Sequence, residues 1–248
     1  MYVGFSTLGC PGVSISHVVA LAVASGAEIV QLRIAHDEPV NLTMSVAQRD
    51  EVRSIFLDNG VTVDSLATYI RLDAPDVVDQ TRSHVDLAVG LGVRRLRVFP
   101  GNATVDEAAA ALAAADAVAA DSGVTLAVET HDDHVRSTDV AAILDRSGTA
   151  ATAVWDILHT TTADETPADS YAALRDRLSE LQIKDVDDVR RPVAPGTGVL
   201  PVAEAIRTAR EGGFTGSIVF EHEAKWHAEA DPFGPALAMA LRIVRDNW

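Results

Sequence analysis

Short, almost wholly apolar runs alternate along the chain with longer segments whose apolar positions recur at helical spacing. Short apolar runs are typical of parallel strands that are buried on both faces. The predicted strands cover residues 2–7, 28–34, 61–66, 95–99, 124–129, 151–156, 181–184 and 217–221. The predicted helices cover 14–24, 49–58, 75–89, 106–121, 137–145, 170–179, 202–211 and 232–246. The pattern is therefore eight strand–helix units in succession.

Helix signals support these boundaries. Thr104 can cap the alanine-rich helix, and Gly123 follows its end. Eight units within 248 residues, with no shift in composition, predict one domain over residues 1–248, a single (β/α)₈ TIM barrel of the α/β class. An open nucleotide-binding sheet is disfavoured, because the turn at 9–12 lacks the Gly-x-Gly-x-x-Gly pattern.

The composition of the chain limits the kinds of molecule that the protein is expected to bind. The chain has 36 acidic against 20 basic residues and a net charge of −16, which disfavours nucleic-acid binding. One cysteine, Cys10, excludes an internal disulfide and a multi-cysteine metal site. The N-terminus lacks the pattern of a signal peptide, and no apolar run is long enough to span a membrane. We expect a soluble, cytoplasmic protein that acts on a small molecule; a homo-oligomer is compatible with the sequence.

Polar side chains end the last four predicted strands. They are Glu129, Asp156, Gln182 (or Asp185 from the same strand) and Glu221. One such acid is ordinarily a helix cap or an ion-pair partner, but polar residues at four successive strand ends indicate a common site at the carboxyl ends of the strands. Oxygen ligands suit Mg²⁺ or Mn²⁺, with Zn²⁺ or Co²⁺ as alternatives. His159, three residues after Asp156, can face the same cavity.

Five motifs together resemble the xylose isomerase-like barrel superfamily, in particular proteins labelled sugar phosphate isomerase/epimerase. The motifs are Glu129-Thr130-His131, Asp156 with His159, Gln182-Ile183-Lys184-Asp185, Pro195-Gly196-Thr197-Gly198, and Gly216 to Glu221 with Glu223. The similarity extends over nearly the whole chain.

The resemblance implies a metal-dependent isomerase or epimerase that acts on a sugar or keto-polyol through a metal-bound enediolate. It implies four ligands for one divalent ion: Glu129, Asp156, Gln182 and Glu221. In such enzymes Glu129 and Glu221 would also exchange the proton, one on each face of the substrate. His159 would hold a substrate oxygen, and Lys184 or Arg190 would offset negative charge on the substrate.

The chain departs from the family pattern at Gln182, where the family has a histidine. An amide oxygen is a harder ligand than imidazole, which shifts the expected metal from Zn²⁺ toward Mn²⁺ or Mg²⁺. Two alternatives stay open: a metal-dependent dehydratase of an inosose-type ketone, and a non-catalytic barrel that binds a small molecule. A phosphodiesterase is disfavoured, because strands three and four end without histidine. Tyr69, Trp155 and Trp226 are candidates for apolar walls of the pocket, with a place in the core as the alternative for Trp155, which lies inside a predicted strand.

Overall fold

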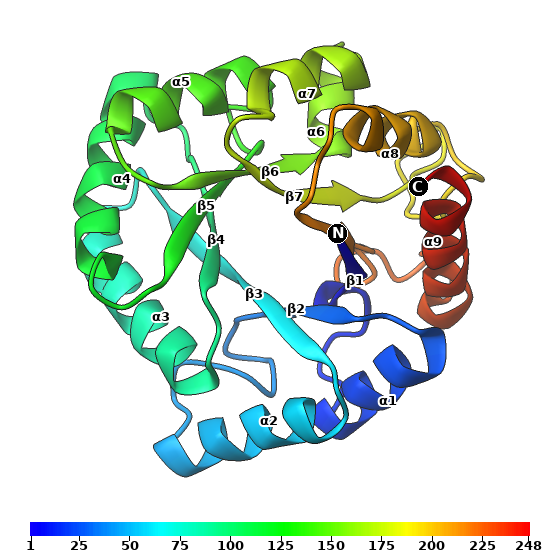
Figure 1. Ribbon diagram of the computed structural model, residues 1–248, viewed down its shortest axis with the longest axis horizontal. Helices are drawn as coiled ribbons and strands as arrows, with labels where there is room; N and C mark the ends of the chain where they lie inside the picture. The colour runs from blue at the N-terminus through cyan, green and yellow to red at the C-terminus, as the bar shows by residue number, and fades with distance from the viewer.

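The computed structural model describes all 248 residues as one closed barrel of eight parallel strands, surrounded by a ring of helices (Figure 1). Each strand pairs with the next in the chain, and β8 closes the barrel on β1. The strands are β1 (Tyr2–Ser6), β2 (Ile29–Arg33), β3 (Thr62–Arg71), β4 (Arg95–Phe99), β5 (Thr125–Glu129), β6 (Thr152–Asp156), β7 (Leu178–Ile183) and β8 (Ser217–Phe220). The predicted (β/α)₈ barrel is confirmed.

The helices lie outside the barrel and connect successive strands. They are η1 (Thr7–Gly9), α1 (Ile15–Ser25), α2 (Val46–Asp58), α3 (Val77–Leu91), α4 (Val105–Ala119), α5 (Ser137–Ser147), α6 (Ile157–Thr162), α7 (Pro167–Leu174), α8 (Val202–Glu211) and α9 (Phe233–Asn247). Thr104 caps α4 as predicted, in a reciprocal pair with Glu107. None of the helices combines the length and apolar character needed to cross a membrane.

Side chains alternate along each strand between the helical layer and the barrel interior. In β5, Leu126 and Val128 belong to the main apolar core, whereas Glu129 belongs to a cluster of carboxylates. In β6, Ala153 and Trp155 belong to the core, and Asp156 belongs to the same cluster. The outward residues hold the helices on the barrel, so the inward positions are free to carry polar groups.

The segment before β7 corrects the sequence interpretation. A helix over 170–179 was expected, but α7 begins at Pro167 and ends at Leu174. Thr166 caps it, and Ser179 and Glu180 already belong to β7. These residues look like an exposed helix end because they are polar, yet Glu180 is fully buried inside the barrel. The short helix α6 and the longer β3 were likewise not predicted.

We expect Leu112→Ala to lower the free energy of unfolding by about 2–5 kcal/mol, because it would leave a cavity between α4 and the barrel. Leu112 has no exposed surface and lies in the main core. Leu57→Ala on α2 is the control, since Leu57 is 69% exposed and its loss should change stability by less than about 0.5 kcal/mol. Urea denaturation of both variants measures the difference; equal effects would contradict this description of the core.

Candidate active site

Three carboxylates converge at the carboxyl ends of the strands, as the sequence predicts. Glu129 from β5, Asp156 from β6 and Glu221 directly after β8 are all buried. One ligand oxygen from each lies within 4.8 Å of the other two. Neighbouring parallel strands place their ends at the same edge of the barrel, which brings together residues up to 92 positions apart.

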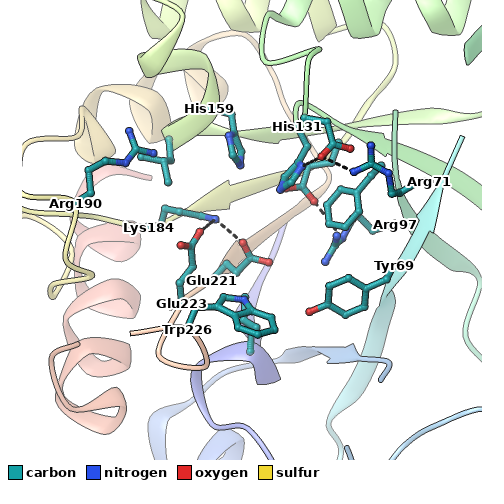
Figure 2. A pocket seen from close by; sticks show the side chains of 15 residues that line it. Tyr69, Arg71, Arg97, His131, His159, Lys184, Arg190, Glu221, Glu223 and Trp226 are labelled. Atoms are coloured by element: carbon teal, nitrogen blue, oxygen red, sulfur yellow. Dashed lines mark hydrogen bonds and ion pairs between the residues drawn. The ribbon is translucent and has the colours of Figure 1, made fainter. Parts of the chain in front are cut away.

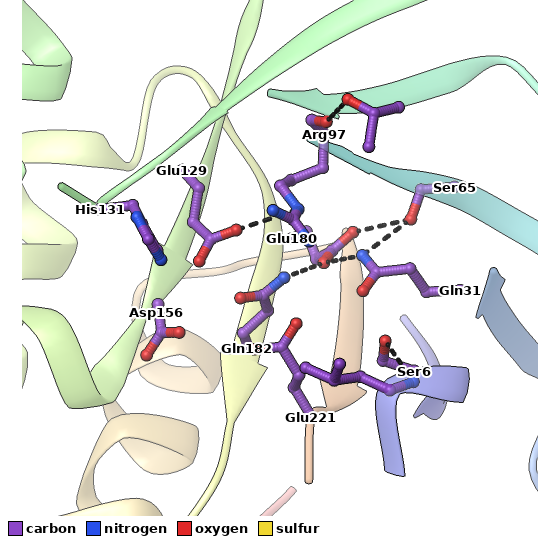
Figure 3. A network of polar contacts seen from close by, with 12 residues as sticks. Ser6, Gln31, Ser65, Arg97, Glu129, His131, Asp156, Glu180, Gln182 and Glu221 are labelled. Atoms are coloured by element: carbon purple, nitrogen blue, oxygen red, sulfur yellow. Dashed lines mark hydrogen bonds and ion pairs between the residues drawn. The ribbon is translucent and has the colours of Figure 1, made fainter. Parts of the chain in front are cut away.

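Gln182, and not Asp185, is the residue of β7 that joins this cluster. Its side chain points into the barrel, and its amide oxygen faces the side of Glu129 and Asp156 (Figure 3). Asp185 instead accepts backbone hydrogen bonds from Gly196 at 2.8 Å and Gly198 at 2.9 Å. It thereby fixes the loop before α8. The alternative between the two residues is decided by the direction of their side chains.

Two buried cations lie against the carboxylates. Lys184 Nζ is 2.7 Å from Asp156 Oδ2 and 2.9 Å from Glu223 Oε1, and it also donates a hydrogen bond to Glu221 (Figure 2). Arg97 Nε, from β4, is 3.1 Å from Glu129 Oε2. The ammonium of Lys184 therefore neutralises charge inside the cluster.

The pKa values of two buried carboxyl groups at the site shift in opposite directions. Burial, reinforced by the negative charges of Glu221 and Asp156, raises the pKa of Glu129 to about 8, although Arg97 opposes the shift. Burial would also raise the pKa of Asp156, but Lys184 and His159 outweigh it and hold that pKa below its ordinary value. The site thus contains one carboxyl group that readily takes a proton beside another that stays ionised.

The donor set fits a divalent cation. The four carboxylates Glu129, Asp156, Glu221 and Glu223, when ionised, exceed the charges of Lys184 and Arg97 by two. Of the four buried side-chain oxygens that lack a hydrogen bond, three belong to this donor set: Glu129 Oε2, Asp156 Oδ2 and Gln182 Oε1. The first two have only ion-pair contacts, and the amide oxygen has no partner. Buried acceptor oxygens are rarely left without a hydrogen bond. A cation of charge +2 would satisfy all three oxygens.

A cavity of about 500 Å³ opens above the cluster. Its apolar wall consists of Leu8, Tyr69, Phe99, Leu158 and Trp226. Its polar lining includes His131 and His159, whose rings meet edge to face with centroids 4.5 Å apart. Burial lowers the pKa of His159, so this imidazole is neutral at pH 7 and can both donate and accept hydrogen bonds.

The remaining predicted residue, Arg190, also lines the cavity, but at its exposed rim. No acidic side chain pairs with it, in contrast to Lys184. Arg190 adopts a positive φ of 65°, which turns the loop after β7 at this point. Arg190 is therefore the lining cation whose charge stays available to a bound molecule.

Sequence reasoning did not name Arg97, and it gave no role to His131 and Glu223, although both belong to the family motifs. His131 lines the cavity, and its Nδ1 lies 3.0 Å from Asp132 Oδ1. Glu223 contacts Lys184. Arg97 had one available signal, because a charged residue in the middle of the apolar run 95–99 needs a buried partner.

The loop after β8 closes one side of the cavity. The guanidinium of Arg33 lies between two aromatic rings, 5.3 Å from the centroid of Tyr69 and 5.5 Å from that of Trp226. Lys225, beside Trp226, pairs with Asp37 from the loop after β2. These contacts place Tyr69 and Trp226 on one wall, as predicted, opposite His159 (Figure 2).

Residues 19–242 match the family model described as "Xylose isomerase-like TIM barrel". The chain therefore belongs to the xylose isomerase-like TIM barrel family. The resemblance seen in its strand-end motifs is confirmed at the level of the family. A search of curated proteins finds no match.

Solved structures share this fold over their full length. A D-allulose 3-epimerase from Methylomonas sp. superposes with a TM-score of 0.81 at 18% identity, covering 100% of this chain and 98% of that one. The probable 3-DHS dehydratase of petrobactin synthesis from Bacillus anthracis gives 0.79 at 14%, covering 99% of both chains. The IolI protein, solved with a bound zinc atom, gives 0.81 at 14%, covering 100% and 99%.

The two lysines of the chain provide a matched test of the cluster. We expect Lys184→Met to lower the free energy of unfolding of the metal-free protein by about 3–5 kcal/mol, because it leaves buried carboxylates without their counterion. Lys225→Met removes a partly exposed ion pair and should cost less than about 1 kcal/mol. Urea denaturation in the presence of a chelator measures both; losses of equal size would contradict the role of Lys184.

Proposed function

We propose that the protein is a divalent-metal-dependent isomerase or epimerase of a sugar or related hydroxy-ketone. The observation that carries the proposal is the approach of Glu129 and Glu221 to within 4.8 Å of each other and of Asp156, at the floor of the cavity. Carboxylates so placed can hold a cation and can also exchange a proton with a substrate above it.

Glu129, Asp156, Gln182 and Glu221 would hold the ion. All four donors are oxygens, so Mn²⁺ or Mg²⁺ is favoured, with Co²⁺ or Zn²⁺ as alternatives. When bound, the ion would polarise the substrate carbonyl and acidify the neighbouring C–H group.

Glu129 and Glu221 would act as the pair that removes and returns this proton. They leave opposite sides of the cluster, from β5 and after β8. Glu129 and Glu221 both line the cavity, where a carboxylate can exchange a proton with a bound molecule. Lys184 keeps Glu221 oriented through its hydrogen bond.

His159 and Arg190 would position the substrate. The neutral imidazole of His159 can hold a hydroxyl or carbonyl oxygen, and Arg190 can bind an oxygen-rich group at the rim. Tyr69 and Trp226 offer aromatic surface to the C–H face of a polyol. The similarity in fold to sugar 3-epimerases supports a substrate of the size of a simple sugar.

A metal-assisted dehydratase is the second candidate. It would start with the same removal of a proton, but a hydroxyl group would then leave. The fold is shared with a probable 3-DHS dehydratase, and the buried ammonium of Lys184 could assist a departing hydroxyl. The mass of the product separates the two, since dehydration loses one water and epimerisation loses nothing.

The proposed function predicts the metal content of the protein. Wild type dialysed against Mn²⁺ should retain about one equivalent by elemental analysis, and Glu221→Gln should lose most of it, because a charged ligand becomes a neutral one. Glu223→Gln is the control: Glu223 contacts Lys184 but lies outside the cluster of three, so its variant should keep the ion. Wild type that binds none of Mn²⁺, Mg²⁺, Co²⁺ or Zn²⁺ would refute the metal site.

The second prediction concerns proton transfer. In D₂O with saturating Mn²⁺, wild type should introduce deuterium next to the carbonyl of a ketose that it accepts, as measured by NMR. Glu129→Gln should slow this exchange at least about 100-fold, because an amide cannot serve as the base. Glu223→Gln again serves as the control. Full exchange by Glu129→Gln would remove this residue from the proton-transferring pair.

A further inference from the structure

The side-chain amide of a glutamine has two ends, and either of them can face a metal ion. Its amide oxygen is a ligand, whereas its NH₂ group only donates hydrogen bonds and cannot bind a cation. Three carboxylates lie beside Gln182, and in the absence of a cation they would attract the NH₂ end. The structure has the opposite orientation, with the oxygen toward Glu129 and Asp156 (Figure 3). Some other group must therefore hold the nitrogen.

That group is Glu180, two residues earlier in β7 and on the same inward face. Its Oε1 accepts a hydrogen bond from Gln182 Nε2 at 3.1 Å and a second from Gln31 Nε2 at 2.6 Å. An ionised carboxylate accepts hydrogen bonds but donates none, so each amide bonded to it must present its nitrogen. The oxygen of Gln182 is thereby directed away from Glu180 and toward the cluster.

We propose that Glu180 is a positioning residue that turns the Gln182 amide so that its oxygen faces the metal; the inference rests on the proposed function, in which Gln182 is a ligand. Two further observations support it. Gln182 Oε1 is buried without any hydrogen bond, as Gln31 Oε1 is, but the Gln182 oxygen faces Glu129 and Asp156, where a cation would meet it. Glu180 is itself held in place, because Ser65 Oγ donates to its Oε2 at 3.1 Å.

Glu180 would thus allow a glutamine to serve as the metal ligand at the position where the family has a histidine. An imidazole presents a lone pair after a simple choice of tautomer, whereas an amide must be prevented from rotating by half a turn. The carboxylate beneath Gln182 supplies this constraint from inside the barrel, where packing leaves it no alternative position.

Calorimetric titration with Mn²⁺ tests the proposal on four proteins: wild type, Glu180→Gln, Gln182→Ala and the double variant. Glu180→Gln should weaken binding about 10–100-fold, because the new amide can donate to the oxygen of Gln182 and draw it away from the ion. Gln182→Ala should weaken binding at least about 10-fold, and adding Glu180→Gln to it should cause no further loss.

Unchanged affinity in Glu180→Gln would overturn the proposal, and so would independent losses that multiply in the double variant, since Glu180 would then act through its charge alone. Asp64→Asn is the control for charge: it removes another negative group inside the barrel, one that pairs with Arg95 beside Glu180 and bonds to Ser217 but not to Gln182. It should change affinity less than about threefold.

Two further results keep the proposal separate from the proposed function. If wild type binds no Mn²⁺, both fail; if wild type binds it and Glu180→Gln binds it equally well, only the role of Glu180 fails. A crystal structure of wild type with Mn²⁺ gives an answer even if Glu180→Gln does not fold. Gln182 Oε1 among the ligands would support the proposal, and a Gln182 side chain outside the coordination sphere would overturn it.

Discussion

The concentration of negative charge at the mouth of the barrel is the constraint on which the site depends. Glu129, Asp156, Glu221 and Glu223 approach one another where little water reaches them, and like charges in such a place repel strongly. Lys184 meets three of these carboxylates and Arg97 meets the fourth. Two cations do not balance four acids, so the cluster keeps an affinity for further positive charge.

This imbalance links folding to function. The barrel strands are held by their outward apolar side chains, which pack on the helices and make the scaffold rigid enough to keep the carboxylates close. Loops then complete the cavity: Arg33 fixes the aromatic wall between β3 and the segment after β8. The proposed metal ligands would thus stand on strands or, for Glu221, directly after one. The groups proposed to contact the substrate come from β3 (Tyr69), α6 (His159) and loops (Arg190 and Trp226).

A network of buried polar side chains lies inside the barrel, beneath the carboxylates. Glu180, Gln31 and Ser65 come from three different strands and form hydrogen bonds beneath the cluster. Such a network is stable only when its members are satisfied, and here the atoms left without partners include the one that faces the carboxylates. The network thus reaches the proposed site through the hydrogen bond from Gln182 to Glu180.

Much of this could be predicted from the sequence, because the relevant signals are local. Alternation of apolar runs and helical segments determined the barrel. The polar residue at the end of each late strand determined which residues meet, since parallel strands end together. The same rule brought Gln182 to the site. It could not choose between Gln182 and Asp185, because that choice depends on the direction in which each side chain leaves the backbone.

Only the tertiary structure decided the partners. Glu180 bonds to Gln31, 149 residues away, and Arg97 pairs with Glu129 on the neighbouring strand. No local pattern marks such pairs, and a buried polar residue such as Glu180 looks in the sequence like the exposed end of a helix. The sequence thus determined where the strands end and which acids they carry, whereas side-chain packing inside the closed barrel decided which cation faces each acid and which way each amide turns.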